Sequence, residues 1–143
     1  MSSFHIIPLV YCPDLRCASF DVLVAPGVPL TTEDLNLVSL FESFPGLRKH
    51  RCDSTHARSF FDEARQTDIV HLLEHLSIEL LVCARPEISR SDIRGETGIP
   101  KSREKQGTAR AHRVRFYGVD SLEEMDALLR QGAALLGAIL PVS

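Results

Sequence analysis

The feature that most constrains this chain is a His-x-x-Glu-His pattern that begins at His71 and lies in an otherwise apolar stretch, residues 68–82. The apolar side chains cover most of the circumference of a helix, which predicts a largely buried helix. Because helical residues advance by about 100° each, His71, His75 and Glu79 form one stripe, and Glu74 lies beside it. The ionisable groups of this helix are therefore gathered on one narrow arc.

This arc has the composition of a metal site. Two histidines one helical turn apart can bind one divalent ion, because both imidazoles leave the same face of the helix. The order is that of the inverted zinc hydrolases, in which the glutamate takes a proton from a metal-bound water. We therefore predict a Zn²⁺ site with His71 and His75 as ligands and Glu74 as general base. The simpler alternative is a buried helix with two solvent-facing histidines.

Length and composition predict one domain that spans residues 1–143. The chain is 44% hydrophobic and 24% charged, which is ordinary for a globular protein with a real core. No apolar run is long enough for a membrane span. Pro8 interrupts the first apolar segment and no basic segment precedes it, so we expect no signal peptide and a cytoplasmic protein. The four cysteines show no CxxC pairing, and we expect them to be reduced.

Charge is unevenly distributed along the chain. Residues 1–84 carry six basic and eleven acidic side chains, whereas residues 85–115 carry nine basic and four acidic ones. A basic segment over a more acidic body favours a polar or charged ligand. The chain has no tryptophan and no basic patch rich in aromatic residues, so we expect no nucleic-acid partner.

Periodic patterns predict the fold class. The clearest patterns are those of strands over residues 19–25 and 111–118 and of helices over residues 31–44 and 121–138. Weaker patterns predict a loop-like or extended lead-in over 1–17, a short extended segment over 47–52, a short helix over 59–65, a strand over 87–94 and a loop-like insertion over about 95–110. This order favours an α+β fold with a single layer of helices on a small, mostly antiparallel sheet. Exposed edges of such a sheet favour a homodimer.

Three stretches together resemble the N-terminal domain of cyanophycin synthetases. They are PGLRKHRC at residues 45–52, HLLEHLSIEL at residues 71–80 and RGETG at residues 94–98. The resemblance covers roughly residues 35–118. It implies the metallohydrolase fold that this domain shares with insulinase-type peptidases and S-ribosylhomocysteinase, which also use His-x-x-Glu-His. It further implies binding, and in some synthetases cleavage, of cyanophycin, a polyaspartate that carries arginine on each side chain.

The resemblance also supplies candidates for the remaining site residues. His50 is the first candidate for the third zinc ligand, followed by Glu79 and then Glu96. Glu79 is less favoured because positions i and i+8 of a straight helix lie about 12 Å apart. If His50 is the ligand, Glu79 becomes a hydrogen-bond acceptor that orients His75. Arg94 would hold a substrate carboxylate or stabilise the oxyanion.

Three functions are compatible with these features. The first is a zinc-dependent hydrolase of a peptide or isopeptide bond in an Asp/Arg-rich substrate. The second is a module that binds a peptide or polymer without chemistry. The third is a hydrolase or lyase of a small metabolite, by analogy with S-ribosylhomocysteinase.

Overall fold

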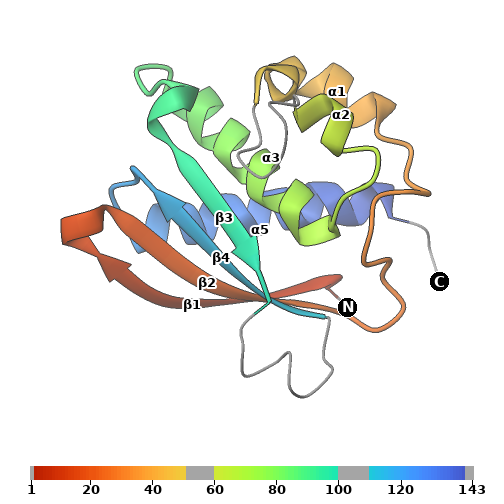
Figure 1. Ribbon diagram of the computed structural model, residues 1–143, viewed down its shortest axis with the longest axis horizontal. Helices are drawn as coiled ribbons and strands as arrows, with labels where there is room; N and C mark the ends of the chain where they lie inside the picture. Colours follow the sequence, from red (N-terminus) through yellow and green to blue (C-terminus); the bar gives the residue numbers. More distant parts are fainter. Residues whose placement is uncertain (1, 51–59, 100–109, 141–143) are drawn as a thin grey trace.

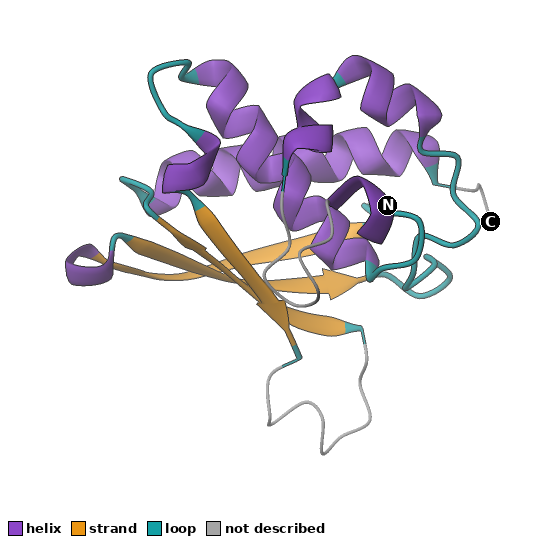
Figure 2. Ribbon diagram, turned by 45° about the horizontal axis from the view of Figure 1, so that its top comes forward, coloured by secondary structure: helices purple, strands orange, loops and turns teal. Residues whose placement is uncertain are grey.

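The computed structural model describes residues 2–50, 60–99 and 110–140, and they form a sheet with helices over one of its faces (Figures 1 and 2). The four strands are antiparallel and lie in the order β1 (Phe4–Cys12), β2 (Cys17–Val24), β4 (Ala111–Tyr117) and β3 (Arg94–Gly98). The predicted α+β class, with helices on a small antiparallel sheet, is confirmed.

Two long helices cover the sheet, α3 (Ile69–Ala84) and α5 (Leu122–Ile139). Ser121 caps α5, because its hydroxyl accepts the backbone N–H of Glu124 at 3.0 Å. The two helices pack closely at Gly132, where a Cβ would lie 3.1 Å from Leu73. The short helices α1 (Val38–Ser43) and α2 (Phe60–Glu63) flank a 3₁₀ turn, Pro45–Lys49. None of the helices in the described ranges combines the length and apolar content that crossing a bilayer requires.

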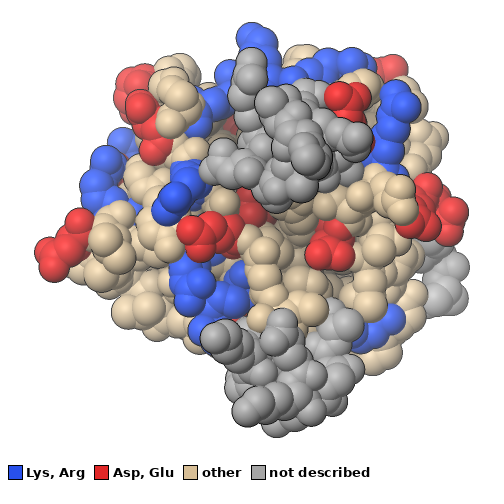
Figure 3. All heavy atoms as spheres, in the orientation of Figure 1, with Lys and Arg blue, Asp and Glu red and all other residues tan. Residues whose placement is uncertain are grey.

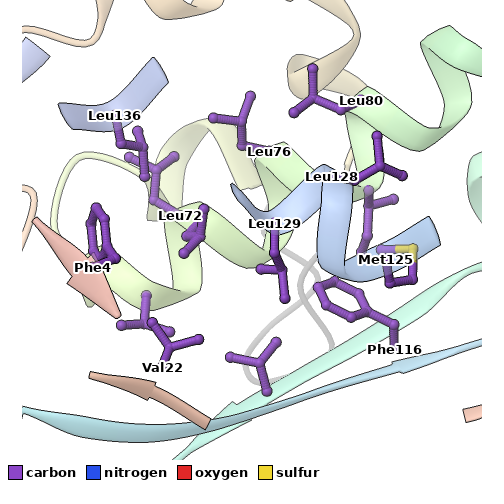
Figure 4. Packing of buried hydrophobic residues seen from close by; sticks show 14 of the residues in the cluster. Phe4, Val22, Leu72, Leu76, Leu80, Phe116, Met125, Leu128, Leu129 and Leu136 are labelled. Atoms are coloured by element: carbon purple, nitrogen blue, oxygen red, sulfur yellow. The ribbon is translucent and has the colours of Figure 1, made fainter. Parts of the chain in front are cut away.

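The core lies between the sheet and the two long helices (Figure 4). Phe116 points from the sheet toward Met125 of α5, whereas Val22 lies on the side of Leu72 of α3. All four side chains are fully buried. The alternation predicted for β4 is confirmed, because His112, Val114 and Phe116 are buried and the residues between them are half-buried. Helix α3 is buried at thirteen of its sixteen positions, as its nearly continuous apolar sequence predicts.

The prediction of a loop-like lead-in was wrong in its main part, because most of that segment is strand β1. Pro8 argued against a strand, because proline has no N–H to donate to a neighbouring strand. Here the proline is tolerated because β1 is an edge strand and its register shifts between Pro8 and Val10. The predicted helix over 31–44 is also shorter than expected. Thr32 lies outside the helix, and its hydroxyl donates to the carbonyl of Ala64 at 2.6 Å.

Two further segments differ from the prediction. Residues 47–49 of the segment predicted as extended belong to the 3₁₀ turn, and only His50, its C-cap, has an extended backbone. The strand expected over 87–94 is replaced by a 3₁₀ turn, Arg90–Asp92, and strand β3 occupies residues predicted as the start of a loop. Its sequence, RGETG, has no apolar alternation because β3 is an edge strand whose residues are all exposed or half-buried. Residues 51–59 and 100–109 of the predicted segments lie outside the described residues.

Candidate metal centre

The predicted site residues lie along one cleft of about 1250 Å³ between α3 and β3. Six residues that the sequence singled out line it: His50, His71, Glu74, His75, Arg94 and Glu96. Glu79 lies on α3, as His71, Glu74 and His75 do, but it is buried behind the lining of the cleft, with an exposed fraction of 2%. The fold therefore brings together segments that are far apart in the sequence.

His71, Glu74 and His75 form a cluster that fits a metal ion. The Nε2 atoms of His71 and His75 are 3.1 Å apart, and Glu74 Oε2 lies 3.4 Å from His75 Nε2. One ligand atom from each residue falls within 4.8 Å of the others. With Zn–N bonds of 2.0–2.1 Å, two ligands of a tetrahedral zinc ion have nitrogens about 3.3 Å apart. The spacing and the donor types of the cluster therefore suit zinc.

Phe60 of α2 fixes the orientation of these imidazoles. Its buried ring stacks on His75, with centroids 3.8 Å apart and an angle of 16° between the planes. The same ring meets His71 edge-on at 5.6 Å. Burial, and then the nearby His71 and His50, lower the pKa of His75 well below its usual value. The ring is therefore neutral, which is the form that binds a metal.

Glu74 is positioned by strand β3. Thr97 donates its hydroxyl to Glu74 Oε1 at 2.8 Å, which leaves Oε2 on the side of His75. Gly95 allows this approach, because a Cβ at that position would lie 2.6 Å from Glu74 Oε2. The glycine in the RGETG stretch is thus required by the contact between α3 and β3.

We predict that Gly95→Ala destabilises the protein by about 1–3 kcal/mol, the usual cost of overpacking a tight contact. The added methyl group must displace either the Glu74 carboxylate or the strand. Gly98→Ala is a matched control in the same strand, since a Cβ at that position meets nothing within 4 Å. Urea denaturation of both variants measures the difference, and equal costs at the two positions would contradict this account.

His50 and Glu79, the first two candidates for the third ligand, bind each other. His50 Nε2 lies 2.9 Å from Glu79 Oε1, and His50 Nδ1 lies 3.0 Å from His75 Nδ1. Arg90 binds the same carboxylate through two N–H bonds of 2.7 Å each. Burial tends to raise the pKa of Glu79, but the hydrogen bonds and charges of Arg90 and His50 outweigh it and lower the pKa to about 2.

The two ring nitrogens of His75 face different neighbours. His71 and Glu74 lie on its Nε2 side, and His50 lies on its Nδ1 side. An ion between His71 and His75 is therefore out of reach of His50, which is placed as a supporting residue. Glu79 likewise supports the site through His50, and not through His75 as the sequence suggested.

The remaining two candidates lie at the rim of the cleft. The Arg94 guanidinium stacks over Tyr117, 4.4 Å from the ring centroid, and its side chain is 57% exposed. Glu96 lies 3.5 Å from Arg94 and is 46% exposed. Both side chains line the cleft and are open to solvent.

Several residues of the site were missed by sequence reasoning. Besides Phe60 and Thr97, Arg90 holds Glu79, and Thr67 hydrogen-bonds His71 Nδ1 at 2.8 Å. Phe60, Thr67 and Arg90 carried no sequence signal for these roles. Thr97, Gly46 and Gly95 did carry one, because all three lie in stretches that resemble the synthetase domain.

Comparisons of the chain with protein-family models, curated proteins and solved structures find no match. The resemblance to the N-terminal domain of cyanophycin synthetases therefore stays a prediction that depends on residues 45–52, 71–80 and 94–98.

Proposed function

We propose that this protein is a zinc-dependent hydrolase of a peptide or isopeptide bond. The observation that carries the proposal is the convergence of His71, Glu74 and His75 within 4.8 Å of one another at a cleft. Two imidazoles that can hold zinc, with a carboxylate beside them that can take a proton from water, are the residues that such hydrolases use. Their sequence order is that of the inverted zinc hydrolases.

The roles of the residues follow from their positions. His71 and His75 would hold zinc, which when bound supplies a water whose pKa is lowered toward 7. Glu74 would take a proton from water at Oε2, because Thr97 already occupies Oε1. Arg94, at the rim, would bind a substrate carboxylate through its guanidinium.

The charges around the cleft support a substrate that carries both signs. Figure 3 shows basic and acidic side chains interspersed on the face that carries β3, and among the described residues neither sign dominates this face. Arg94 and Glu96 are neighbours at the rim and could bind a carboxylate and a guanidinium, respectively. An Asp/Arg-rich peptide or polymer, the substrate class implied by the resemblance, has both groups.

The proposal is tested by metal analysis and by one isosteric substitution. Tag-free protein should carry about one zinc ion per chain, as a single catalytic site requires. Glu74→Gln should keep this zinc and lose at least about a hundredfold of the hydrolysis rate on a β-aspartyl-arginine peptide, because the amide cannot accept the proton.

Glu87→Gln is the matched control, since Glu87 is 63% exposed and pairs with Arg85. It should keep both zinc and activity. Full activity in Glu74→Gln would rule out this mechanism.

A module that binds a peptide without chemistry is the second candidate. It is favoured by the hydrogen-bond distances of 3.0 and 3.1 Å that join the rings of His50, His75 and His71, because these bonds satisfy the histidines among themselves. Protein that takes up no zinc but binds the same peptide, and returns it uncleaved, would support this candidate.

A further inference from the structure

A continuous series of hydrogen bonds leads from the wall of the cleft to the Nδ1 atom of His75. Arg90, Glu79, His50 and His75 form it, and we call these four residues the Arg90 relay. Three of them are buried, with exposed fractions of 2% for Glu79, 6% for His50 and 5% for His75. The Arg90 side chain is 30% exposed and closes the outer end. In a buried series of this kind, each donor must meet an acceptor.

The direction of each bond follows from the carboxylate. Glu79 is ionised and can only accept, so His50 must donate to it through Nε2–H. This assignment gives His50 a single N–H, the one that Glu79 accepts. His50 Nδ1 is therefore an acceptor, and His75 donates to it through Nδ1–H. This assignment leaves a lone pair on His75 Nε2, the atom that faces His71 and Glu74.

We propose that Arg90 and Glu79 are positioning residues that act through His50 to hold His75 in the tautomer that can bind a metal. The inference rests on the proposed function in one respect only, namely that zinc binds at His71 and His75. In the opposite tautomer, a proton on Nε2 would occupy the side of the ring where the ion is to bind. Neither Arg90 nor Glu79 needs to touch the ion to control its affinity.

Gly46 gives independent support to this assignment. A Cβ at this position would overlap both Glu79 Oε2 and the Arg90 Nη2 atom. The 3₁₀ turn that carries Gly46 also carries His50 at its C-terminal end. One turn of the chain thus makes room for the ion pair and presents the imidazole that the pair orients.

The tautomer can be measured directly in zinc-free protein. Long-range ¹H–¹⁵N NMR correlations of the histidine rings report which nitrogen of each ring carries a proton. We expect the proton of His75 on Nδ1 and that of His50 on Nε2. A wild-type His75 protonated on Nε2 would overturn the proposal, and this measurement needs no variant.

Zinc affinity gives the second readout, by competition with a chelator. Glu79→Gln should weaken zinc binding about 10–100-fold, the usual effect of losing a partner of a metal ligand. The amide cannot accept from Arg90 at both positions and from His50 as well. The NMR spectrum of this variant should show His75 redistributed between its two tautomers.

Arg90→Lys is a milder variant, which takes the place of Glu79→Gln if that protein does not fold. It keeps the charge but loses the paired N–H bonds, and a smaller loss of affinity in the same direction is expected. Glu87→Gln is again the control and should leave both readouts unchanged. Unchanged zinc affinity in a folded Glu79→Gln would overturn the proposal and leave the proposed function intact. A wild-type protein that shows the expected tautomers but binds no zinc would overturn the proposed function alone.

Discussion

Gly46→Ala is expected to destabilise the protein by about 3 kcal/mol, the cost of disrupting a buried ion pair. The new methyl group would overlap Glu79 Oε2 and Arg90 Nη2 and would lie 2.7 Å from Glu79 Cδ. The Glu79 carboxylate is buried, so it cannot move into water without losing its partners. The backbone at Gly46 is not left-handed, and alanine itself fits the turn. The expected cost therefore comes from the collision with the ion pair.

Equilibrium denaturation of the zinc-free protein measures this cost. Gly98→Ala serves as the control because its Cβ meets no atom within 4 Å, and its effect should stay within about 0.5 kcal/mol. In an Arg90→Ala background the space beside Gly46 is partly open, so Gly46→Ala should cost less there than in the wild type. Equal costs in the two backgrounds would show that the ion pair is not what the methyl group displaces.

The elements with strong periodicity could be predicted from the sequence. Strand β4 alternates buried and half-buried residues, and α5 has both an N-cap serine and an apolar face, so local sequence and burial agree. The apolar run of α3 likewise predicted a helix buried on nearly all sides. In each case the residues that decide the structure lie within a few positions of one another.

The edge strands could not be predicted in the same way. Strand β1 contains Pro8, and β3 contains Gly95 and Gly98, residues that normally argue against a strand. Within the described sheet, each of these strands pairs with one neighbouring strand only. The other side of each strand therefore has no strand pairing that a proline or a glycine would weaken. Their pairing depends on β2 and β4, which lie elsewhere in the sequence.

The site shows the same division. The His-x-x-Glu-His spacing places His71, Glu74 and His75 on one arc, and the structure brings their ligand atoms together. The partners that orient them come from other segments, such as His50, which is 25 residues from His75, and Thr97, which is 23 residues from Glu74. Helical geometry contains no information about such contacts. The sequence could therefore indicate several residues of the site, but neither all of their partners nor which residues bind each other.

Acidification from about pH 5 to pH 2 is expected to remove about 3 kcal/mol of stability through Glu79. Its pKa is about 2 in the folded protein, against 4.5 as the ordinary value. Burial opposes ionisation, but Arg90 and His50 favour it more strongly. Because the folded pKa is the lower one, this stability is fully present above pH 4.5. It is lost as the pH falls toward 2 and the folded protein takes up the proton.

Glu79→Gln separates this effect from that of the other carboxyl groups. Denaturation curves of both zinc-free proteins between pH 6 and pH 2 should show the wild type losing its advantage over the variant as the pH falls. The variant has no proton to take up at this position, so its remaining pH dependence reports the rest of the molecule, including Asp120, whose pKa is lowered by Arg16 and Arg85. Parallel curves would mean that Glu79 has the same pKa in the folded and the unfolded chain. In that case the bonds from Arg90 and His50 would not favour the ionised carboxylate in solution. The donors and acceptors assigned within the Arg90 relay, which follow from an ionised Glu79, would then be without support.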